Sequence, residues 1–140
     1  VWNSNMYLTI DAIEILDGLI DVYLTDFKYG NNNCAKRLSK VENYWDIITR
    51  NHKIARIQCE VIIRHLIMPN HIECCTKPII KWLSKNLEIF RLKLMYQYRP
   101  QYHGIDYEDI NRRLKRGEFN GALRYAKDVI GEKYLEPSLE

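Results

Sequence analysis

The chain has 140 residues, of which 46% are hydrophobic and 28% charged, and its formal net charge is +3. This length allows one domain, and the composition excludes a disordered or low-complexity chain. No segment reaches the ~20 consecutive apolar residues of a membrane span, so we expect no membrane partner. The 21 basic residues are balanced by 18 acidic ones and form no continuous basic stripe, so we also expect no nucleic acid partner.

The cysteines indicate a reducing, cytoplasmic environment. They are Cys34, Cys59, Cys74 and Cys75. Their spacing is not that of a disulfide framework, and two adjacent cysteines have poor geometry for a disulfide. No secretory signal opens the chain. The first residues already resemble the end of a strand, so we expect this chain to be the C-terminal part of a longer protein.

Strand and helix signals alternate from the first residue. A strand stub at 1–2 is followed by a helix that Thr9 caps. Its core-facing residues are expected to be Ala12, Ile13, Leu16, Leu19 and Ile20. A buried strand begins at 22–24, and a loop with a possible helix cap follows at 30–33. The periodicity of 44–55 then predicts a helix.

The strongest strand signal covers residues 61–68. Its apolar residues are continuous rather than alternating, which predicts a strand covered on both faces. Thr76 is expected to cap the next helix, in which Pro78 occupies the tolerant first turn. A fourth strand is predicted over 92–98.

The last third of the chain is expected to be less regular. We predict a loop at 102–106 and a short helix from Asp106 to about Leu114. An amphipathic helix should cover 119–130, and the tail from Glu132 should be loose.

This alternation predicts an α/β fold of parallel βαβ units with right-handed crossovers, in a single domain over residues 1–140. An open doubly wound sheet and an arc of a β/α barrel both fit the pattern. In either architecture ligands bind at the carboxyl ends of the strands. The polar residues at these ends include Asn3, Ser4, Asp26, Lys28, Gln97 and Tyr98.

Arg64 is unusual because it interrupts an apolar strand. A buried guanidinium group needs a carboxylate, phosphate or carbonyl partner. It could contact a ligand at the carboxyl ends of the strands, or it could pair with a structural acid such as Asp26. Asp26 and Lys28 are two residues apart and should share a face, which suits a ribose or amino-acid ligand or a simple salt bridge. We predict that all three side chains converge on one concave face.

The segment from His71 to Cys75 contains one histidine and two adjacent cysteines. A zinc site needs four nitrogen or sulfur ligands, and the sequence shows no second cluster that would supply the rest. We therefore predict no metal site and interpret these thiols as small side chains packed at a helix start. Cys34 and Cys59 are expected to be core or partly buried residues.

Four blocks of the sequence resemble a known family. The blocks are VWNSNMY, VYLTDFKYG, VIIRHLIMPNHIECCTKP, and LMYQYRPQY with EDINRRL. In order and spacing they are similar to radical S-adenosylmethionine proteins, in the branch of iron–sulfur relatives of pyruvate formate-lyase activating enzyme. The resemblance implies the C-terminal arc, about four strands, of a partial TIM-like (β/α)6 barrel with C-terminal helices. It also implies S-adenosylmethionine and a 4Fe-4S cluster in the complete protein, which would act on a protein or small-molecule substrate.

The resemblance also implies cofactor contacts. Asn3 and Ser4 would lie near the methionine end of S-adenosylmethionine, Asp26 and Lys28 near its ribose and carboxylate, Arg64 beside it, and Gln97 and Tyr98 near its adenine.

The CxxxCxxC segment that holds the family's cluster is absent from the 140 residues. We therefore expect this chain alone to bind no cluster and to be inactive. The alternative function is a stand-alone α/β module that binds a ligand or protein without catalysis. A barrel cut open in this way exposes a strand edge and an apolar face, so we expect self-association.

Overall fold

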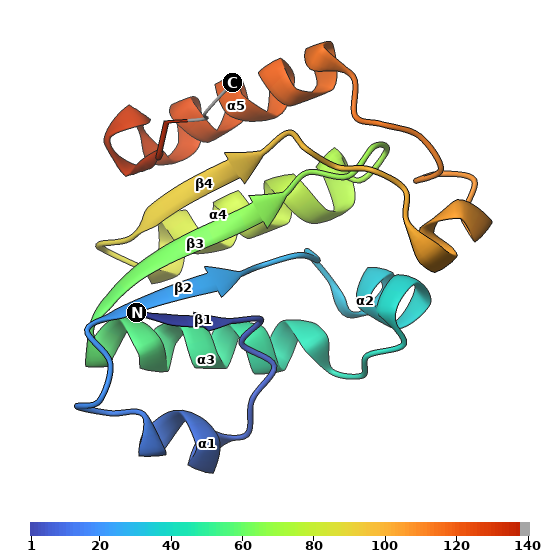
Figure 1. The fold of residues 1–140 in the computed structure, drawn as a ribbon. Helices are drawn as coiled ribbons and strands as arrows, with labels where there is room; N and C mark the ends of the chain where they lie inside the picture. The colour runs from blue at the N-terminus through green and yellow to red at the C-terminus, as the bar shows by residue number, and fades with distance from the viewer. Residues whose placement is uncertain (138–140) are drawn as a thin grey trace.

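The computed structural model describes residues 1–137 and contains one parallel β-sheet with helices packed against it (Figure 1). The strands are β1 (Trp2–Ser4), β2 (Val22–Asp26), β3 (Glu60–Leu66) and β4 (Arg91–Met95). The α-helices are α1 (Ile10–Ile15), α2 (Asn32–Ser39), α3 (Tyr44–Gln58), α4 (Lys77–Asn86) and α5 (Arg116–Ile130). The predicted α/β fold with parallel βαβ units is confirmed.

The strands lie in the same order in the sheet as in the sequence, β1-β2-β3-β4, and every neighbouring pair is parallel. α3 and α4 cover one face of the sheet, and α5 packs against α4 (Figure 1). α2 lies beyond the carboxyl ends of the strands (Figure 1). The loops that follow β2 and β3 therefore meet at the same end of the sheet.

The two faces of the sheet differ in burial. In β3, Val61, Ile63 and His65 are buried towards the helices, whereas Ile62 and Arg64 are only half-buried on the opposite face. β2 and β4 show the same alternation. The prediction that both faces of the third strand are covered is therefore wrong, because α3 and α4 cover one face only.

The core between the sheet and the helices is rich in aromatic side chains. The Phe27 ring stacks on the His52 ring at a centroid distance of 4.9 Å, and Trp45 and Trp82 pack around it. Phe27 follows β2 directly, so this cluster fixes the carboxyl end of β2 against α3 and α4.

The N-terminal half differs from the expectation in two helices: α2 was not expected, and α1 is shorter than expected. Asn31 caps α2 by accepting a hydrogen bond from the Cys34 N–H, and left-handed backbone at Lys40 and Asn43 separates α2 from α3. Thr9 caps α1 as predicted, but α1 ends before Leu19, whose side chain is 74% exposed rather than in the core.

Thr76 does not cap a helix with its side chain. It continues a π-helical turn, Ile72–Thr76, that runs directly into α4. Its hydroxyl instead hydrogen-bonds the buried Nε2 of His65 at 2.8 Å. The Thr76 hydroxyl therefore bonds the His65 side chain of β3 and not the backbone N–H groups at the start of α4.

Two predictions for the C-terminal third are also wrong. No helix forms between Asp106 and Leu114; a 3-10 turn covers Tyr102–Asp106, and the next residues form turns. The tail is ordered up to Glu136, whose N–H donates to the Leu92 carbonyl at 2.9 Å. Both segments are held by contacts that are distant in sequence. The last residues of the expected loose tail, 138–140, lie outside the described part.

Among residues 1–137, no helix has both the length and the apolar character required to cross a bilayer.

Candidate functional site

Three adjacent strands bring polar side chains together on the sheet face opposite the helices. The Arg64 Nε donates to Asp26 Oδ1 at 2.9 Å, and its Nη2 lies 2.8 Å from the same oxygen. The Nη2 also donates to Asn3 Oδ1 at 2.7 Å. The Arg64 and Asp26 side chains remain 25% and 29% exposed. We call Asn3, Asp26 and Arg64 the rim cluster.

The strand register explains this convergence. Asp26 pairs with Arg64, and Arg64 pairs with Lys93, so their side chains project from the same face. Arg64 avoids the helix layer, where its charge would be desolvated against apolar side chains. Because the ion pair is open to solvent on one side, a ligand can reach the guanidinium group without unfolding the sheet.

Two other predicted site residues lie beside a separate cavity. Lys28 and Tyr98 line a cavity of about 220 Å³, together with side chains such as Leu66 and Tyr107. The Tyr98 hydroxyl donates to the Ile110 carbonyl at 3.0 Å, and burial raises the pKa of this phenol. The expected convergence of Lys28 with the rim cluster is therefore not supported by a direct contact in the described residues.

The remaining two predicted residues join neither group. The Ser4 hydroxyl accepts a hydrogen bond from the Met6 N–H at 2.9 Å and shapes the loop after β1. Gln97 lies beyond the end of β4 and is exposed. Their nearness in sequence to the strand ends did not determine where their side chains point.

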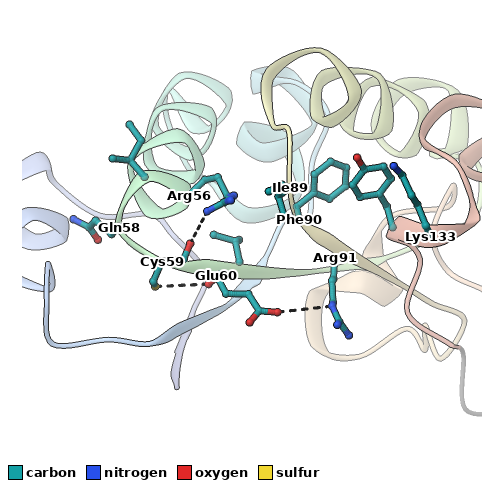
Figure 2. A pocket seen from close by; sticks show the side chains of 11 residues that line it. Arg56, Gln58, Cys59, Glu60, Ile89, Phe90, Arg91 and Lys133 are labelled. Atoms are coloured by element: carbon teal, nitrogen blue, oxygen red, sulfur yellow. Dashed lines mark hydrogen bonds and ion pairs between the residues drawn. The ribbon is translucent and has the colours of Figure 1, made fainter.

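A larger cavity, of about 690 Å³, lies at the amino ends of β3 and β4 (Figure 2). Glu60 and Arg91 approach each other across it at 3.7 Å, and Arg56 donates to the Cys59 carbonyl at 3.3 Å (Figure 2). In parallel α/β folds the amino ends of strands serve stability, whereas ligands bind at the carboxyl ends. Its position therefore makes this cavity a weaker candidate than the rim cluster.

The structure also reveals a group that the sequence did not. Cys34, at the start of α2, lies beside His71, Cys74 and Cys75, and one ligand atom from each residue falls within 4.8 Å of all the others. Cys34 is half-buried, in line with the expectation of a core or partly buried residue, but no local pattern links it to His71, which is 37 positions away. Only the packing of α2 on the loop after β3 brings them together.

Burial raises the pKa of Cys75 strongly and that of Cys74 less, and the Cys34 thiol adds to both increases. A cation among these sulfurs would reverse this effect, because a coordinated thiol loses its proton.

A search against protein-family models found no match. A comparison with curated proteins found the uncharacterized protein MJ0674 of Methanocaldococcus jannaschii, 57% identical over 127 residues. The alignment covers 91% of this chain but only 37% of that protein. The chain thus spans little more than a third of the length of the relative it matches.

Proposed function

We propose that this chain is the C-terminal part of a radical S-adenosylmethionine enzyme related to pyruvate formate-lyase activating enzyme, and that the rim cluster contacts S-adenosylmethionine. The observation that carries the proposal is the convergence of Asn3, Asp26 and Arg64 at one end of a parallel sheet, on its helix-free face. In a β/α barrel this is the inner face, at the end where ligands bind.

The sheet topology supports a barrel arc over a doubly wound sheet. A doubly wound sheet reverses its strand order at a switch point and carries helices on both faces. Here the order β1-β2-β3-β4 does not reverse, and α3 and α4 lie on one face (Figure 1). The relative is long enough to hold the remaining strands of a partial barrel, since the alignment covers 37% of it.

The rim cluster has functional groups that suit S-adenosylmethionine. The Arg64 guanidinium can donate to a carboxylate, and the Asp26 carboxylate can accept from an ammonium or ribose hydroxyl group. Asn3 and Asp26 hold the guanidinium in place from neighbouring strands, so it is oriented before a ligand arrives. In this family the bound cofactor supplies a radical after reductive cleavage.

The 140 residues do not fit the family's 4Fe-4S cluster, because the chain has no CxxxCxxC segment. Such a cluster is the electron donor that side chains cannot replace. We therefore assign to this chain the binding and orientation of S-adenosylmethionine and of the substrate, and no electron transfer.

The test is S-adenosylmethionine binding to the complete protein by equilibrium dialysis under anaerobic conditions. Arg64→Met should weaken binding at least about tenfold, which is the loss of one charge-assisted hydrogen bond. Arg91→Met is the matched control, since Arg91 forms ion pairs at the opposite end of the sheet. This control should bind like the wild-type protein.

Two results would contradict the proposal. One is equal affinity in the wild-type and Arg64→Met proteins, with only thermal stability reduced, which would make Arg64 a structural partner of Asp26. The other is a reading frame that starts at Val1 without an upstream CxxxCxxC segment, which would favour a non-catalytic binding module.

A further inference from the structure

We propose that Cys34, His71, Cys74 and Cys75 bind one Zn²⁺ ion in a closed, tetrahedral structural site. This inference is independent of the function proposed above, because it uses none of the rim residues. Cys34 lies in the first turn of α2, which follows β2, and the other three residues lie in the segment between β3 and α4.

Specific contacts of Gly30 and Asn31 hold the segment after β2 against the segment after β3. Asn31 caps α2 at the Cys34 N–H and also donates from Nδ2 to the Cys74 carbonyl at 2.8 Å. Gly30 lies directly under the second loop: a Cβ atom there would be 2.6 Å from backbone atoms of Cys74 and Cys75. The loop itself is a π-helical turn, an uncommon conformation that is frequent at functional sites.

Five of the six distances between the donor atoms are close to those of a tetrahedron around one ion, and the sixth, between the Cys34 and Cys75 sulfurs, is within 4.8 Å. Zinc bonds of about 2.3 Å to sulfur and about 2.05 Å to nitrogen place two sulfurs about 3.8 Å apart and a sulfur and a nitrogen about 3.6 Å apart. The Cys34 and Cys74 sulfurs are 3.8 Å apart, and those of Cys74 and Cys75 are 3.9 Å apart. His71 Nδ1 lies 3.7, 3.3 and 3.7 Å from the sulfurs of Cys34, Cys74 and Cys75.

The His71 ring is oriented as a metal ligand. Its Nε2 lies 2.7 Å from Asp109 Oδ2, so Nε2 carries the proton and Nδ1 directs its lone pair at the three sulfurs. Asp109 is held in turn by an ion pair with Arg37. A carboxylate that fixes the tautomer and direction of a ligating histidine is the usual outer partner in zinc sites.

The set of donors favours zinc over other occupants. Three thiolates and one imidazole are a standard set for structural Zn²⁺, and four protein ligands leave no position open for catalysis. An iron–sulfur cluster would place its own sulfides between the cysteines and spread them beyond these separations. A disulfide would join two sulfurs at about 2.05 Å and leave His71 without a role.

The ion would join three segments at the carboxyl end of the sheet. Two segments supply ligands directly, and the third, around Asp109, contacts the site through His71. The Tyr107 hydroxyl of this third segment also donates to the Arg37 carbonyl at 2.7 Å. These contacts explain why the helix expected between Asp106 and Leu114 does not form.

The experiment is metal analysis of the 140-residue chain, purified without an affinity tag from cells supplied with zinc. We expect about one Zn²⁺ per chain, and a tetrahedral thiolate spectrum after replacement by Co²⁺. Cys34→Ser should lose most of the zinc, while Cys59→Ser should keep it, since Cys59 is a free thiol outside the group. Asp109→Asn should retain all four ligands but weaken zinc binding roughly 10- to 100-fold in chelator competition.

Several results would overturn the proposal. They are a metal-free chain whose mass shows a disulfide, iron with inorganic sulfide in place of zinc, and equal zinc content in Cys34→Ser and Cys59→Ser. If Cys34→Ser does not fold, the wild-type chain decides: removal of zinc by a chelator should lower its melting temperature, and restored zinc should raise it. An unchanged melting temperature would also reject a structural site.

Discussion

Two histidines, His52 in α3 and His65 in β3, are almost completely buried, and both contact Phe27. His52 Nδ1 donates to the Ile48 carbonyl at 2.9 Å, and its Nε2 accepts from the Thr25 hydroxyl at 2.8 Å. His65 donates to the Phe27 carbonyl at 2.7 Å and accepts from Thr76. Both rings are therefore neutral in the folded protein. Burial lowers the pKa of each from 6.5 to about 4.

These histidines predict a loss of stability in mild acid. The unfolded chain takes up a proton at each histidine below pH 6.5, whereas the folded protein does so only near pH 4. Their contribution is complete above pH 6.5 and falls as the pH drops towards 4. At pH 5 the free energy of unfolding should be about 2 kcal/mol lower for each histidine than at pH 7.5. Urea unfolding at both pH values measures this, and His52→Gln should remove about half of the difference.

Gly30 should not tolerate a side chain. A Cβ at this position would lie 2.6 Å from the backbone of Cys74 and Cys75, which cannot move without shifting the whole loop. Gly30→Ala should therefore cost roughly 1–3 kcal/mol in the free energy of unfolding. Gly121→Ala is the matched control, because Gly121 lies in α5 with open space around it. Alanine there should stabilise by roughly 0.5–1 kcal/mol, and equal effects of the two changes would contradict this assignment.

At the scale of elements, α5 depends on an ion pair at its first turn. The Arg112 guanidinium binds both Glu118 carboxylate oxygens at 2.8 Å, and the Lys115 N–H donates to Glu118 at 2.8 Å. Arg112 lowers the pKa of Glu118 from 4.5 to about 2. The resulting stabilisation is complete above pH 4.5 and is lost as the pH falls towards 2.

Removing this charge should weaken the start of α5. Glu118→Gln should lower the free energy of unfolding by about 1 kcal/mol at pH 7, a modest value because Arg112 is partly exposed. The difference from the wild-type chain should shrink below pH 4. Asp128→Asn removes the same charge from the last turn of α5, where a carboxylate opposes the helix dipole, and should not destabilise. Chemical unfolding of the wild-type, Glu118→Gln and Asp128→Asn chains at pH 7 and at a pH below 4 provides the comparison.

The elements that the sequence predicted correctly are those with strong local signals. β2, β3, α3 and α5 have clear periodicity or continuous apolar residues, and Thr9 and Asn31 are favourable caps. The errors occur where distant contacts outweigh local preference. Asp106 begins no helix because the following segment is bound through Asp109 to Arg37 and His71.

The candidate site was predictable only in part, for a similar reason. Alternation along a strand places Asp26 and Arg64 on one face, because both residues lie within regular strands. Lys28 and Gln97 lie beyond the strand ends, where alternation no longer applies. Cys34 has no local pattern at all, and its place beside His71 depends on how α2 folds back over the next loop.

At the scale of the whole molecule, the uncovered sheet face predicts self-association, as the sequence suggested. We propose that this face, on which Leu24 and Ile62 lie side by side and are only half-buried, pairs with a second copy of the chain. The sedimentation coefficient should rise with concentration. Ile62→Lys should reduce this rise, whereas Leu19→Lys, in the turn before β2, should not. A single monomeric species at high concentration would refute the proposal.

The ordered C-terminal segment leaves the two edges of the sheet unequally free to pair with a further strand. Leu135 bridges the outer side of β4 at Leu92, and Arg91 holds Glu136 through an ion pair of 2.7 Å. The Leu92 carbonyl on this edge is thus already bonded to the Glu136 N–H, so the chain itself obstructs the pairing of a new strand beside the start of β4. β1 has no such cover within the described residues (Figure 1). Any strand that extends this sheet, from the same protein or from another, should therefore add next to β1.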